Sequence, residues 1–232
     1  MTTVILLRHG RTTANTGGVL AGWTPGVTLD ETGVQQAQAV AERLAKVPLA
    51  AVVSSPLERC RQTAGLVAAG RDLEVRTDER LGEARYGDWT GRPLKELVKD
   101  PLWKVVQQHP SAAVFPGDEG EGLAQTQARA VAAVRAWNAE LGKDAVWLAC
   151  SHGDVIKAIV ADALGLHLDQ FQRIVVDPAS ISVVTYTDTR PFVARMNDTG
   201  GDVAALVPPP RRRRRRTPSS DAVVGGGAGP GA

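Results

Sequence analysis

Cysteine is scarce in this chain of 232 residues, and its scarcity narrows the possible classes of protein. The only two cysteines, Cys60 and Cys150, belong neither to a Cys-x-x-Cys pair nor to a cluster of cysteine and histidine with metal-ligand spacing. We therefore expect a reduced, cytoplasmic protein without a structural zinc site.

Long apolar runs are also absent. No stretch approaches the roughly 18 apolar residues that suggest a membrane span, so we expect none. The N-terminus lacks a basic stretch followed by a cleavable apolar segment, and we expect no secretory signal. With 43% hydrophobic and 22% charged residues, the composition is that of an ordinary globular protein with one sizeable core.

Positive charge is concentrated near the C-terminus, in the run Arg211–Arg216. Six arginines and one aspartate give residues 208–232 a net charge of +5, so residues 1–207, with 21 basic and 24 acidic side chains, carry −3. We expect one domain over 1–207 and a disordered Pro/Arg/Gly-rich tail, because 208–232 has too few apolar residues to fold. The arginines predict weak, salt-sensitive attraction to anionic surfaces and no specific nucleic-acid binding.

Predicted strands and helices alternate along the domain. The strands lie near 3–7, 50–54, 74–77, 145–150 and 181–187, and the helices near 31–47, 56–69, 122–142 and 153–164. Asp30 is a good N-cap for the first helix, with Glu31 in its first turn. The alternation predicts an α/β protein, a three-layer α/β/α sandwich around a mostly parallel sheet. Residues 84–121, which contain four prolines, interrupt the alternation, and we expect them to form a small lid over the carboxyl edge of the sheet.

Two histidines each follow an apolar run that reads as a buried strand. His9 follows the run Val4–Leu7, with one arginine between them. His152 follows the run Val146–Ala149, with a cysteine and a serine between them. Because ligands bind at the carboxyl ends of parallel strands, we expect both rings in one pocket, with Gly10 allowing the backbone to approach a ligand. Neutral imidazole is a nucleophile near pH 7, so we expect His9 to attack phosphorus, its other nitrogen held by a backbone carbonyl.

Phosphoryl transfer also needs cations for the phosphoryl oxygens. Arg8 can clamp two of these oxygens with its guanidinium. A second arginine is available just after the predicted strand 50–54, where Arg59 and Arg61 diverge on the helix that follows. Gly153 begins another helix, whose free N–H groups attract phosphate.

The leaving oxygen needs an acid, and four carboxylates compete for this role. Apolar neighbours of Glu83 would desolvate its carboxyl and raise its pKa toward the working pH. The competitors are Asp88, Asp118 and Glu119. The physical argument alone leaves the choice open.

Four segments within residues 3–190 resemble, in the same order, the motifs of the histidine phosphatase superfamily, which includes the cofactor-dependent phosphoglycerate mutases. They are Arg8–Gly10, Ser55–Ala64, Leu81–Gly91 and Ser151–Gly153. The resemblance implies a phosphoglycerate mutase-like fold and a phosphohistidine at His9. It selects Arg59 as the second arginine and Glu83 as the proton donor, with Arg8 and His152 completing the catalytic set.

The resemblance also implies which residues surround the substrate. Thr12 and Asn15 match polar residues that line the phosphate site in many members of the family. The segment Leu20–Trp23 matches the family's substrate loop, so we expect Gly22 to contact the substrate, as we do Gly153.

Three positions depart from the family pattern and bear on the substrate rather than on the chemistry. Arg11 stands where mutases carry glutamate, Ala21 replaces a commonly polar residue, and Gly120 stands where serine is common. We predict a metal-independent phosphomonoester hydrolase that acts on a small phosphorylated metabolite and needs no cofactor. The alternatives are a phosphomutase of the phosphoglycerate mutase type and a weakly active protein that binds a phosphorylated ligand.

Overall fold

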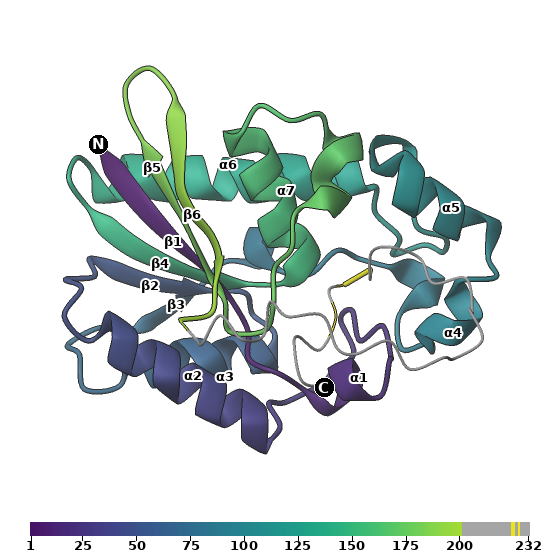
Figure 1. Cartoon of the computed structure of the whole chain (residues 1–232), viewed down its shortest axis with the longest axis horizontal. Coiled ribbons are helices and arrows are strands. Elements are labelled where there is room, and N and C mark those ends of the chain that lie inside the picture. Colours follow the sequence, from purple (N-terminus) through teal and green to yellow (C-terminus); the bar gives the residue numbers. More distant parts are fainter. Residues whose placement is uncertain (201–223, 226, 228–232) are drawn as a thin grey trace, which may run out of the picture.

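A six-stranded mixed sheet forms the centre of the computed structural model, which describes residues 1–200, 224–225 and 227 (Figure 1). Its strands are β1 (Thr2–Arg8), β2 (Ala51–Ser54), β3 (Val75–Thr77), β4 (Val146–Ser151), β5 (Ile181–Tyr186) and β6 (Pro191–Asp198). The order is β3-β2-β4-β1-β5-β6. The first four run parallel, whereas β5 is antiparallel to β1 and β6 to β5. The predicted mostly parallel sheet is confirmed, and β6 is an additional strand.

Side chains of β1 alternate between the two faces of the sheet. Val4 and Leu6 belong to one hydrophobic core, and Ile5 and Leu7 to the other. All four are buried, because a central strand of a doubly covered sheet is enclosed on both sides. This explains why β1 reads as a continuous apolar run.

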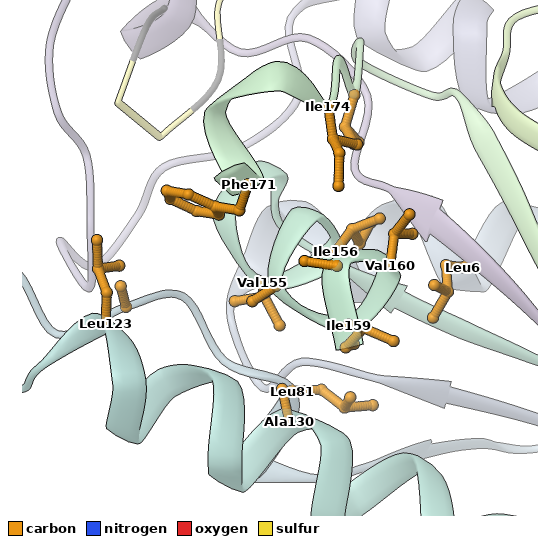
Figure 2. Packing of buried hydrophobic residues seen from close by; sticks show 14 of the residues in the cluster. Leu6, Leu81, Leu123, Ala130, Val155, Ile156, Ile159, Val160, Phe171 and Ile174 are labelled. Atoms are coloured by element: carbon orange, nitrogen blue, oxygen red, sulfur yellow. The ribbon is translucent and has the colours of Figure 1, made fainter. Parts of the chain in front are cut away.

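Two pairs of helices cover the two faces. They are α6 (Leu123–Leu141) with α7 (Gly153–Ala163), and α2 (Glu31–Leu44) with α3 (Glu58–Ala68), above and below the sheet in Figure 1. Figure 2 shows the first core, where Val155, Ile159 and Val160 of α7 lie between α6 and Leu6 of β1. The predicted three-layer sandwich is thereby confirmed. Within the described ranges, no helix is long and apolar enough to span a membrane.

The start of α2 fixes the loop that follows His9. The Asp30 side chain accepts a hydrogen bond from the Gly33 N–H at 2.7 Å, as expected of an N-cap. A Cβ added to Gly10 would lie 2.4 Å from the Gly33 carbonyl oxygen, and one added to Gly33 would lie 2.0 Å from that of Arg11. Gly10 therefore admits the backbone of α2 rather than the backbone-to-ligand approach that we expected.

Residues 84–121 lie beyond the carboxyl end of the sheet, on the right of Figure 1. They contain η2 (Gly87–Trp89), α4 (Leu94–Leu97), α5 (Pro101–Gln108) and η3 (Pro110–Ala112). Trp89 is buried against Trp103 and Phe115, with ring centroids 6.1 and 5.5 Å away. These aromatic side chains belong to the same hydrophobic core as Leu6, so the insertion is packed onto the domain, and its action as a lid stays a prediction.

The expected domain end at 207 and the arginine run fall outside the described residues. Of the expected tail the structure describes Val224 and Gly225, which lie against the domain, and the disorder of the tail stays a prediction. Both residues lie beside the cavity that contains His9.

Candidate active site

A small cavity of about 40 Å³ opens where the carboxyl ends of β1, β2 and β4 meet. Six of the nine expected site residues line it, namely His9, Thr12, Asn15, Gly22, Arg59 and Glu83. The other three, Arg8, His152 and Gly153, are buried and do not line it. The sheet therefore brings together residues from segments that are far apart in the sequence.

His9 directly follows β1, and its backbone N–H donates to the Ser151 carbonyl on β4 at 3.0 Å. Its ring Nδ1 lies 2.7 Å from the carbonyl oxygen of Gly10, which can only accept a hydrogen bond. Nδ1 must therefore carry the hydrogen, which leaves the lone pair of the neutral ring on Nε2. The expected carbonyl partner of His9 is present.

The surroundings of His9 keep its ring neutral. Burial, followed by the charges of Arg59 and Arg8, lowers the pKa of His9 well below its ordinary value of 6.5. The side chain is 3% exposed. The His9 ring is thus unprotonated at neutral pH, the state that a nucleophilic role requires.

Arg59 comes from the first turn of α3 and is 2% exposed. Its Nη2 donates to the Gly22 carbonyl at 2.8 Å and to Nδ1 of His152 at 3.2 Å. Its Nη1 is buried and has no hydrogen-bond partner in the part of the chain that the structure describes. A buried cation with an unused donor at a cavity is suited to an anion. Arg61, by contrast, is exposed.

The second histidine, His152, precedes α7, and its ring centroid lies 5.3 Å from that of His9. An arginine can only donate, so the bond from Arg59 shows that Nδ1 of His152 is unprotonated. The proton of the neutral ring is then on Nε2, which lies 2.8 Å from the hydroxyl oxygen of Ser55. Burial, then the charge of Arg59, lowers the pKa of His152 well below its ordinary value. In this state His152 orients Arg59.

Glu83 lies at the cavity and is 3% exposed. One carboxyl oxygen accepts from the Ala84 N–H at 3.0 Å, and the other lies 3.8 Å from Nδ1 of His152. Burial, and next the charge of Asp154, raises the pKa of Glu83 to about 7, although Arg59 and Arg8 lower it. A carboxyl group that is half protonated near neutral pH can both donate and accept a proton.

The three competing carboxylates are not at this cavity. Asp88, Asp118 and Glu119 are exposed and line a second cavity of about 500 Å³. Glu83 is therefore the carboxyl group that the fold places beside His9, in agreement with the choice made by resemblance.

Thr12 and Asn15, at the start of α1 (Thr13–Thr16), line the cavity, whereas Arg8 does not. Arg8 is fully buried, and its Nη1 donates to the Val176 carbonyl at 2.8 Å. Thr12 caps α1, and its hydroxyl donates to the side-chain oxygen of Asn15 at 2.9 Å. Thr12 and Asn15 thus form one hydrogen-bonded unit in the cavity wall, whereas Arg8 acts on His9 from outside the wall.

Asp154 is a buried carboxylate beside the site that the sequence analysis did not single out. It is completely buried in the first turn of α7, and one carboxyl oxygen accepts from the Tyr86 hydroxyl at 2.9 Å. Its other oxygen lies 3.5 Å from Nζ of Lys157. An acidic residue directly after the His-Gly pair was the available indication. Tyr86, expected only to desolvate Glu83, also connects Asp154 to the cavity.

The comparison with known proteins agrees with this fold. Residues 4–199 match the model of the histidine phosphatase superfamily (branch 1), and the chain belongs to this superfamily. Over 210 residues it is 31% identical to the probable phosphoglycerate mutase GpmB of Yersinia pestis (strain Pestoides F), covering 89% of this chain and 95% of that protein.

Similar solved structures include phosphatases. YhfR of Bacillus stearothermophilus matches with a TM-score of 0.79 at 29% identity, covering 85% of this chain and 98% of that one. A mutant phosphoserine phosphatase from Entamoeba histolytica, in complex with phosphoserine, matches with a TM-score of 0.77 at 26% identity, covering 86% and 98%. The relatives thus carry the names of both a mutase and a phosphatase.

Proposed function

We propose that the chain hydrolyses a small phosphorylated metabolite through a phosphohistidine at His9, without a metal or an organic cofactor. The observation that carries this proposal is the His9 ring, which is buried, neutral and fixed through Nδ1 at a cavity shared with Arg59 and Glu83. The similar phosphoserine phosphatase, whose structure contains a phosphomonoester, supports the proposed class of substrate.

In the first step, Nε2 of His9 attacks phosphorus while the bond to the leaving oxygen breaks. Protonated Glu83 gives its proton to that oxygen, so an alcohol departs and a carboxylate remains. In the second step, the Glu83 carboxylate takes a proton from water, whose oxygen attacks phosphorus and releases inorganic phosphate. The N–P bond breaks, and both residues return to their starting states.

Positive groups around His9 stabilise the transferring phosphoryl group. Nη1 of Arg59 is the donor available for a phosphoryl oxygen. Arg8 adds charge, and the Gly153 amide lies at the positive end of α7. Nδ1 of His152 accepts a hydrogen bond from Arg59, so His152 supports the transfer by holding this arginine in place.

A phosphomutase is the second candidate, favoured by the relative named as a probable phosphoglycerate mutase. The structure bears on one difference from mutases. Arg11 pairs with Asp30 at 2.8 Å and donates to Thr32 at 2.7 Å, so its side chain is held at the start of α2. The cavity therefore gains no carboxylate from this position, which supports hydrolysis over the mutase reaction.

A panel of phosphorylated metabolites, tested without added metal, distinguishes these activities. We expect free phosphate to be released from at least one small phosphomonoester. An isomerised ester without free phosphate would replace hydrolysis by the mutase reaction. A folded protein that binds esters but converts none would instead be a phospho-ligand binding protein.

Changing Asp154 to asparagine should move the pH dependence of the first step. A negative charge beside a carboxyl group disfavours its ionisation, so Asp154 helps to keep Glu83 protonated. Asp154→Asn removes this charge, and the decline of kcat/KM at high pH should move to lower pH by about one unit. Asp162→Asn, on the same helix but paired with Arg135, is the matched control and should leave the profile unchanged. An unmoved profile in Asp154→Asn would contradict this role.

A further inference from the structure

Part of the cavity wall comes from the far end of the chain. Val224 is 1% exposed and belongs to the same hydrophobic core as Leu20 and Tyr86. Val224 and Gly225 both line the cavity that contains His9 (Figure 1, yellow). An apolar side chain that is almost fully buried indicates a seated segment rather than a passing contact.

The backbone of this segment bonds to charged groups of the site. The Gly225 N–H donates to a carboxyl oxygen of Asp154 at 2.9 Å, the same oxygen that accepts from Tyr86. The Gly225 carbonyl oxygen lies 3.5 Å from Nη2 of Arg8. The backbone N–H and the backbone carbonyl of Gly225 are thereby both matched, the donor to a carboxylate and the acceptor to a guanidinium.

Position 225 favours glycine. Its φ is +75°, in the left-handed region that side chains disfavour. An added Cβ would also lie 2.9 Å from Cδ1 of Leu20 and 3.5 Å from the Tyr86 hydroxyl oxygen. A β-branched side chain at this position would therefore disfavour the bound position of the segment.

The volume left beside the segment is small. About 40 Å³ holds a few water molecules and is comparable to a phosphoryl group, far below the roughly 300–1,000 Å³ of a typical ligand pocket. A phosphomonoester also needs room for its organic part. Val224 and Gly225 line this same cavity, so they border the space that the organic part would need.

We propose that the wall formed by Leu20, Tyr86 and Asp154 is a binding site for the chain's own segment Val224–Gly225, which the organic part of a substrate must displace. This inference rests on the proposed function in one respect, namely that the ligand competing with the segment is a phosphomonoester. The segment acts as an internal competitor for phosphomonoesters and leaves the binding of inorganic phosphate unaffected.

Gly225→Val in the full-length chain tests the competition. The two probes are inorganic phosphate and phenylphosphonate. Phenylphosphonate carries an aryl group on phosphorus through a C–P bond, which is not hydrolysed. Calorimetric titration should show phenylphosphonate binding about tenfold more tightly to the variant, as expected when a competitor occupies its site about nine-tenths of the time. The dissociation constant of inorganic phosphate should not change.

Gly70→Val is the matched control, because Gly70 has a φ of +74° and no atom near its added Cβ. It should leave both dissociation constants unchanged. Unaltered phenylphosphonate affinity in Gly225→Val, or an equal gain in Gly70→Val, would overturn the proposal.

Amide hydrogen exchange keeps this test separate from the proposed function. The C-terminal peptide containing Gly225 should be protected in the wild type, lose protection in Gly225→Val, and lose it in the wild type when phenylphosphonate is added. Absence of protection in the wild type would show that the segment Val224–Gly225 does not bind to the domain. A protected segment in a protein that binds neither probe would refute the proposed function and the competition, while the binding of the segment to the domain would stand.

Discussion

Replacing His9 with alanine is expected to lower kcat/KM for phosphate release by at least about 10³-fold. The cavity would keep Arg59 and Glu83 but would lose the imidazole nitrogen proposed to accept the phosphoryl group. Steady-state phosphate release measures the loss. Mass spectrometry of rapidly quenched protein should find a phosphoryl group on His9 in the wild type and none at position 9 in the variant.

The fold should survive this substitution. The His9 ring donates only to the carbonyl of its neighbour Gly10, and losing one such bond costs about 1 kcal/mol. His109→Ala is the matched control, since His109 is exposed and lies 3.9 Å from its partner Asp169. Turnover close to wild type in a folded His9→Ala protein would exclude the phosphohistidine mechanism.

The strands that carry the site were predictable because central parallel strands are apolar without interruption. The apolar runs before His9 and His152 therefore indicated β1 and β4. The edge strand β6 has mostly exposed or half-buried side chains and offers no such run. Helix α5 was missed because Pro101 reads as an interruption, whereas it is the first residue of a helix capped by Asp100.

The chemistry-bearing residues were predictable where a local motif follows a strand. Arg59 and Glu83 were selected by resemblance, and the cavity contains both. The contacts of Asp154 could not be predicted from the sequence, because they join Asp154 to Tyr86 and Gly225, which are 68 and 71 residues away along the chain. Periodicity and composition describe neighbours in sequence, so they could not indicate contacts such as that between Gly225 and Asp154.

Glu83→Gln should separate substrates by their leaving groups. For an alkyl phosphomonoester we expect kcat/KM to fall by about 10²–10⁴, the usual contribution of a general acid. For p-nitrophenyl phosphate, whose leaving anion is stable without a proton, the loss should be about tenfold or less. The comparison uses kcat/KM because this constant covers only the steps up to departure of the alcohol. The second step, which also uses Glu83, therefore does not enter.

The pH dependence gives a second readout of the same residue. With its pKa raised to about 7, Glu83 is protonated below that pH, so kcat/KM for an alkyl ester should fall as pH rises above about 7. His9, whose pKa is far below 6.5, stays neutral through this range and adds no opposing change near neutrality. Glu83→Gln should abolish the decline, whereas Glu119→Gln, at an exposed position outside the cavity, should retain it. Equal losses for both esters, or a decline that persists in Glu83→Gln, would assign the acid role to another group.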